Sequence, residues 1–224
     1  MKSNPRPFQQ AVKRGCDIIG AGAGIIILSP LFAGIAVLIR LTMGRPVMFF
    51  QRRPGLHGKP FVTCKFRTMR EAFSPDGKPL SDSDRLISLG RFLRKTSLDE
   101  LPQLWNVFVG EMSLVGPRPL AMEYLSRYTP EQSRRHEMRP GITGLAQVTG
   151  RNAMPFSQRI ACDLHYIDHY SLWLDVRILA LTIFRVGTGR LYDGAGQDVR
   201  VVDDLGLAAK EPSDLGNAAA RYSK

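Results

Sequence analysis

Two adjacent acidic residues, Asp99 and Glu100, have the side-chain types and spacing that catalysis on a phosphate group would need. Ser97 precedes Glu100 by three positions, which is the spacing of a capping box, so one interpretation is simply the start of a helix. The same physics supports a second interpretation, because a helix N-terminus lowers the pKa of a carboxylate and attracts phosphate. An ionised Asp99 can attack phosphorus or hold Mg²⁺ against a diphosphate, with Glu100 as base or metal support.

Basic residues accompany the acidic pair. Arg94 comes just before it, Lys65 lies in an upstream basic string, and Arg151 follows a glycine in a downstream turn. Arg118 stands between two prolines that restrict its backbone, and a held guanidinium suits bidentate contact with phosphate. The alternative is a solvated basic face that meets anionic lipid. Both interpretations stay open at this point.

The charge balance of the whole chain points to anionic partners. Its 224 residues carry 31 Lys and Arg against 20 Asp and Glu, a formal net charge of +11. Nucleic acid, acidic lipid head groups and phosphorylated substrates all fit such a charge. No nucleic-acid-binding module is recognisable, so we expect no nucleic-acid partner. The three cysteines form no C-x-x-C motif, which favours a reducing compartment over a disulfide or zinc framework.

An uncharged apolar run covers residues 18–39. As a helix it would be about 33 Å long, close to the roughly 30 Å core of a bilayer. Hydropathy alone favours a single transmembrane span. Two features favour a helix that enters and returns: Ser29-Pro30 at the centre predicts a kink, and both flanks are basic, which the positive-inside rule places on the cytoplasmic side.

The remaining pattern predicts an α+β fold, with a mostly helical catalytic domain, interfacial amphipathic helices and a small β element. Extended segments are expected at residues 47–50 and 61–64, and helices at 84–93, 131–138, 155–170 and 172–186. The last of these is either a core helix or one that lies in the membrane interface. The predicted division is a membrane helix in residues 1–40, a cytoplasmic catalytic domain in 41–187, and a C-terminal tail in 188–224.

Seven strings, taken in order, resemble those of the bacterial sugar transferases, the monotopic phosphoglycosyl transferases. The resemblance runs from about residue 8 to about residue 187 and is specific because the order is kept. The strings are Ser29-Pro30, Gln51-Arg52-Arg53-Pro54-Gly55, Lys65-Phe66-Arg67-Thr68-Met69, Ser97-Leu98-Asp99-Glu100-Leu101, Val115-Gly116-Pro117-Arg118-Pro119, Arg139-Pro140-Gly141-Ile142-Thr143-Gly144 and Gly150-Arg151-Asn152.

The resemblance implies a reaction and a set of roles. Asp99 would be a nucleophile that contacts Mg²⁺ and attacks the sugar-linked phosphorus of a UDP-sugar, which releases UMP and leaves an aspartyl phosphosugar intermediate. Polyprenyl (undecaprenyl) phosphate would then take the sugar phosphate and start the assembly of a glycoconjugate. Glu100 matches the second acid. The basic positions that match phosphate or nucleotide contacts are Lys65, Arg94, Arg118 and Arg151.

The resemblance also implies a location. The N-terminal helix would be re-entrant and broken at Ser29-Pro30, so that the enzyme is monotopic on the cytoplasmic face of the inner membrane and contacts membrane lipid. The sequence leaves the sugar open between a hexose and an N-acetylated amino sugar, and it also leaves a homodimer open. A non-catalytic basic membrane adaptor is the competing hypothesis.

Overall fold

The computed structural model describes residues 7–74, 76–77, 80–150, 154–188 and 203–205. The predicted tail therefore lies almost entirely outside the described residues. The elements, in chain order, are α1 (Pro7–Met43), β1 (Met48–Pro54), η1 (Leu56–Gly58), β2 (Pro60–Phe66), α2 (Asp82–Arg85), α3 (Ser88–Lys95), η2 (Leu98–Glu100), α4 (Gln103–Val109), β3 (Ser113–Val115), η3 (Met122–Arg127), α5 (Pro130–Ser133), η4 (Arg134–Glu137), β4 (Gly141–Thr143), α6 (Leu145–Thr149), α7 (Phe156–Asp168) and α8 (Leu172–Gly187).

The two small sheets confirm the mixed helical and β prediction. β1 and β2 form an antiparallel hairpin in the register Met48 to Phe66 and Pro54 to Pro60, which contains the expected segment 61–64 and all of 47–50 except its first residue. β3 and β4 form a short parallel pair. The expected helix at 84–93 is two helices, α2 and α3, because Leu86 and Ile87 are extended between them. The expected helix at 131–138 corresponds to α5 and η4.

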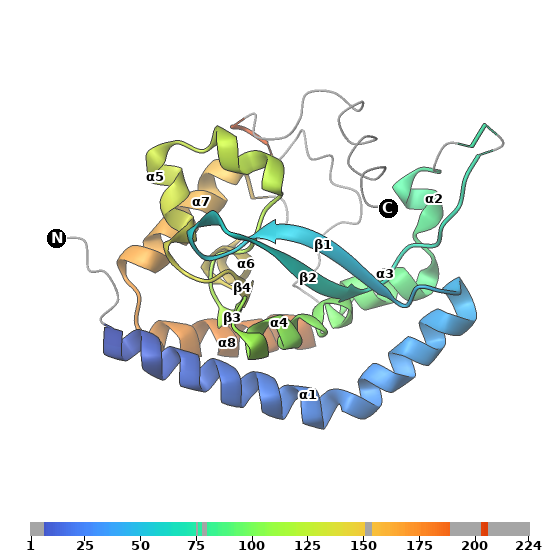
Figure 1. The fold of residues 1–224 in the computed structure, drawn as a ribbon, viewed down its shortest axis with the longest axis horizontal. Helices are drawn as coiled ribbons and strands as arrows, with labels where there is room; N and C mark the ends of the chain where they lie inside the picture. The colour runs from blue at the N-terminus through green and yellow to red at the C-terminus, as the bar shows by residue number, and fades with distance from the viewer. Residues whose placement is uncertain (1–6, 75, 78–79, 151–153, 189–202, 206–224) are drawn as a thin grey trace.

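Helix α1 is continuous over 37 residues and bends at mid-length (Figure 1). Pro30 has no N–H to donate to the carbonyl of Ile26, one turn earlier. The Ser29 hydroxyl donates to that same carbonyl at 2.8 Å, which compensates the lost backbone bond. The predicted break at Ser29-Pro30 is therefore a satisfied bend. By length and composition α1 is the one helix in the described part that could cross a membrane.

The body packs against both arms of the bent helix. On the first arm, Ala21 packs with Leu104 and Val107 of α4. On the second arm, Ile39 is fully buried in a cluster with Phe66 of β2. The bend lets one helix follow the underside of the body, where Figure 1 shows α1 passing beneath α4 and the hairpin.

Helix α8 has a core face, as one of its two interpretations predicted, while its place in a membrane interface stays a prediction. One face is core, since Ile178 is 1% exposed within a cluster of buried residues. The other face presents Trp173, Ile183 and Phe184, which are 75%, 74% and 60% exposed. Helix α4 likewise exposes Trp105. Bulky apolar side chains on the surface of two helices form an exposed apolar surface of the kind that marks an interaction site.

Candidate active site

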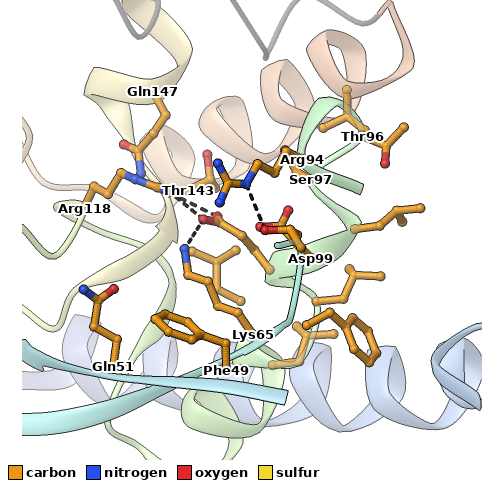
Figure 2. Close-up of a pocket in the computed structure, with 18 of the residues that line it drawn as sticks. Phe49, Gln51, Lys65, Arg94, Thr96, Ser97, Asp99, Arg118, Thr143 and Gln147 are labelled. Carbon is orange, nitrogen blue, oxygen red and sulfur yellow. Dashed lines mark hydrogen bonds and ion pairs between the residues drawn. The ribbon is translucent and has the colours of Figure 1, made fainter. Parts of the chain in front are cut away.

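A cleft of about 780 Å³ opens beside the acidic pair (Figure 2). Lys65 reaches it from β2, Arg94 from α3, the acids Asp99 and Glu100 from η2, and Arg118 from the loop after β3. Five candidate residues, spread over 54 positions of sequence from 65 to 118, thus line one space. The sixth candidate, Arg151, lies outside the described residues.

The capping-box interpretation of Ser97 is wrong. Ser97 has a left-handed backbone with φ of 56°, and its side chain makes no capping hydrogen bond. This conformation turns the chain sharply between α3 and η2, a strained geometry for a residue with a Cβ. The Glu100 side chain, which a capping box would use at the Ser97 backbone, instead bonds to cations from β2 and from the loop after β3.

Glu100 is held by two cations. Its Oε1 accepts from Lys65 Nζ at 2.5 Å and from Arg118 Nη2 at 2.6 Å, and its Oε2 accepts from Arg118 Nη1 at 3.1 Å. Burial alone would raise the pKa of the Glu100 carboxyl, but Arg118 and Lys65 together lower it well below its usual range. Glu100 is therefore a firmly ionised counter-charge and a poor proton acceptor.

Asp99 has the opposite environment. It is buried, and within the described part of the chain its carboxylate accepts no hydrogen bond and forms no ion pair. Burial and the neighbouring Glu100 raise its pKa to about 6, against the smaller opposing effects of Lys65, Arg94 and Arg118. The expectation that a helix N-terminus lowers this pKa is wrong, because η2 is a three-residue turn and desolvation dominates. A poorly solvated carboxylate without partners is a suitable nucleophile.

Further hydrogen bonds hold the Arg94 and Arg118 residues in position. Arg94 Nε donates to the Thr68 hydroxyl at 2.9 Å, which orients its guanidinium at the edge of the cleft. Behind Arg118, its backbone carbonyl accepts from Arg135 Nη2 at 2.7 Å. Arg135 in turn pairs with Asp163 at 2.6 Å, and both side chains are 2% exposed. No local sequence pattern predicts this buried pair, whose members are 28 positions apart on η4 and α7.

The two acids do not form a complete magnesium site, so substrate phosphates would have to supply further ligands. In the described part of the chain no cluster of three or more His, Cys, Asp or Glu side chains exists. Mg²⁺ is usually bound by one or two carboxylates together with substrate phosphates and water. The unpartnered Asp99 provides one such ligand, whereas the Glu100 oxygens are engaged by Lys65 and Arg118.

Comparison with known proteins identifies the family of this chain. The profile of the family described as bacterial sugar transferase matches residues 8–189, and the chain belongs to that family. It is 49% identical to the sugar transferase EpsL of Bacillus subtilis, over 78% of this chain and 87% of the relative.

Two further relatives differ in the sugar that their names give. A UDP-glucose:undecaprenyl-phosphate glucose-1-phosphate transferase of Caulobacter vibrioides is 42% identical over 80% of this chain and 71% of its own length. A UDP-N-acetylgalactosamine-undecaprenyl-phosphate N-acetylgalactosaminephosphotransferase of Aeromonas hydrophila is 40% identical over 83% of this chain and 46% of its own length.

Proposed function

We propose that this protein is a phosphoglycosyl transferase that moves a sugar 1-phosphate from a UDP-sugar to undecaprenyl phosphate and so starts the assembly of a glycoconjugate. The observation that carries the proposal is the contrast within the acidic pair: Glu100 is fully engaged by cations, while Asp99 is buried in the cleft with its carboxylate free among the described residues. The names of the relatives support the donor and acceptor classes.

In the first step, an Asp99 carboxylate oxygen attacks the sugar-linked phosphorus of the donor. The new bond joins that oxygen to phosphorus, the phosphorus–oxygen bond to UMP breaks, and UMP leaves with the bonding electrons. In the second step, an oxygen of undecaprenyl phosphate attacks the same phosphorus. The bond to Asp99 then breaks and the carboxylate is regenerated. One nucleophile used twice keeps two anionic substrates from having to meet in a single step.

The cations give this route its electrostatic support. Arg118 is 42% exposed at its side chain, so it can contact a donor phosphate while Glu100 keeps it in place. Lys65 and Arg94 extend the same positive lining. Mg²⁺, bound by Asp99 and the donor diphosphate, would neutralise phosphate charge. Glu100, already ionised and paired, positions Lys65 and Arg118.

The proposed location is the cytoplasmic face of the inner membrane, with α1 re-entrant. The satisfied bend at Ser29 and Pro30 supports this arrangement, as do the exposed apolar faces of α4 and α8 beside α1. Labelling of tags at the two ends of the chain in intact spheroplasts tests it. A re-entrant helix leaves both tags protected from an impermeant reagent, whereas a spanning helix exposes one.

The test of the reaction is UMP release by purified protein with Mg²⁺, undecaprenyl phosphate and a panel of UDP-hexoses and UDP-N-acetylhexosamines. We expect UMP with at least one donor, and a loss of at least about 10³-fold in Asp99→Asn, because the nucleophile is removed. Donor without acceptor should give one UMP per enzyme and a labelled protein. Folded, membrane-inserted protein that releases no UMP would favour the basic adaptor.

A further inference from the structure

Gln147 carries a buried amide without a partner. Its side-chain Nε2 and Oε1 are both shielded from solvent, and neither makes a hydrogen bond to any described residue. Leaving a buried polar group unsatisfied destabilises a protein, and most such groups in native proteins have partners. Gln147 also lines the cleft that contains Asp99. A ligand bound in the cleft would be the source of the hydrogen bonds that this amide lacks.

The local backbone makes room for this amide. Gln147 lies on α6, and Gly144 precedes that helix. A Cβ at Gly144 would stand 2.2 Å from the backbone oxygen of Gly116, which excludes any other residue there, and 2.9 Å from Gln147 Oε1, so the glycine also keeps the space beside the carboxamide open. Gln147 and Arg118, which contacts Glu100, both line this cleft (Figure 2), so the amide faces the same space as the reacting groups.

Thr143 adds a second polar group to the same wall. The Thr182 hydroxyl donates its proton to the Ile178 carbonyl at 2.8 Å, as in many helices. The bond of 2.7 Å between the Thr143 and Thr182 hydroxyls must therefore use the Thr143 proton. The Thr143 oxygen is left able only to accept. Together with Gln147, the wall offers two acceptor oxygens and the two N–H donors of one amide nitrogen.

A ligand that matches this wall needs at least two donors and one acceptor close together. Adjacent hydroxyl groups of a pyranose satisfy that need, because each hydroxyl both donates and accepts. The imide edge of uracil carries a single N–H donor and matches less well. The sugar is also the part of the donor attached directly to the phosphorus that Asp99 would attack, next to Arg118 and Glu100.

We propose that Gln147, with Thr143, binds the hydroxyl groups of the transferred sugar and sets which UDP-sugar is accepted. This inference rests on the proposed function, since it assigns a role within the same cleft. Gln147 is then a specificity-determining residue that contacts substrate. Its amide is left unpaired whenever the sugar lacks the matching hydroxyl, and that mismatch is the source of discrimination.

The experiment compares wild type with Gln147→Leu and Thr143→Val in the intact membrane-inserted protein. Affinities are measured for UMP and for UDP-sugars that differ at one hydroxyl or in an acetamido group, alongside UMP release. For the preferred sugar we expect Gln147→Leu to weaken binding by roughly three- to tenfold. The preference over other sugars should shrink by a similar factor, while UMP affinity is unchanged. Gln158→Leu, exposed on α7, is the matched control and should behave as wild type.

Each other outcome overturns the assignment. Equal weakening for UMP and for all UDP-sugars would assign the amide to the nucleotide. Unchanged preferences in a folded Gln147→Leu protein would remove it from recognition, and a lowered Tm with uniform loss would make it structural. Failure of the proposed function looks different: wild type would bind UDP-sugars without releasing UMP, and the affinity comparison would still decide the role of Gln147.

Discussion

Replacing Asp99 with asparagine should stabilise the protein while abolishing its activity. The pKa of Asp99 is raised from 3.8 to about 6, mainly because the carboxylate is buried. The folded state therefore binds this proton more tightly than the unfolded state, and stability falls as pH rises from about 4 to about 6. A difference of about two pKa units corresponds to about 3 kcal/mol at pH 7.5. Asparagine carries no charge to desolvate, so it should recover most of that amount.

The assay is thermal unfolding of wild type and Asp99→Asn in the same lipid nanodiscs at pH 7.5 and pH 4. We expect the variant to melt several degrees higher at pH 7.5 and the difference to vanish near pH 4, where Asp99 is protonated. Glu100→Gln is the control of opposite sign, because its loss leaves Lys65 and Arg118 without a counter-charge. An Asp99→Asn protein that melts at or below wild type at pH 7.5 would refute the desolvation argument.

Three further predictions follow from other contacts. The kcat/KM for UDP-sugar should rise with pH and level off above about pH 6, because only ionised Asp99 attacks, and a flat profile from pH 5 to 8 would exclude Asp99 as the titrating group. Pro30→Ala restores the backbone N–H donor that the Ile26 carbonyl lacks and should straighten α1, lowering UMP release and Tm; equal activity and Tm would show that the bend is dispensable. Arg135→Met leaves Asp163 as an unpaired buried charge and should lower the unfolding free energy by about 3–5 kcal/mol in denaturant titration, with a smaller loss in the double variant Arg135→Met/Asp163→Leu.

The elements that could be predicted from sequence are those with a local physical signal. The apolar periodicity of residues 172–186 predicts α8, and Pro and Gly turns on either side of two apolar runs predict the hairpin of β1 and β2. Ser29-Pro30 predicts the bend because both the missing donor and its replacement are adjacent in the chain. Each of these patterns is confined to a short segment of the chain, so the element can be predicted without knowledge of any tertiary contact.

What could not be predicted depends on contacts between distant residues. The capping-box pattern at Ser97 is a local preference that the fold does not use. The Glu100 side chain bonds instead to Lys65 and Arg118, which are 35 and 18 positions away in the sequence. The raised pKa of Asp99 follows from burial, which a helix-terminus argument does not contain. Gln147 had no signal at all, because the absence of a partner is visible only once the surrounding walls are in place.

The opposite environments of the two acids also constrain how the pair can evolve. Two adjacent carboxylates in one cleft repel each other, and Glu100 is among the causes that raise the pKa of Asp99. The cations reduce that repulsion, but they are hydrogen-bonded to Glu100 alone, which keeps Asp99 desolvated and reactive. A Lys or Arg side chain bonded directly to Asp99 in the resting protein would stabilise the fold, but it would compete with Mg²⁺ and the donor phosphates for that carboxylate. Activity in this cleft therefore depends on leaving one acid without the partner that stability alone would favour.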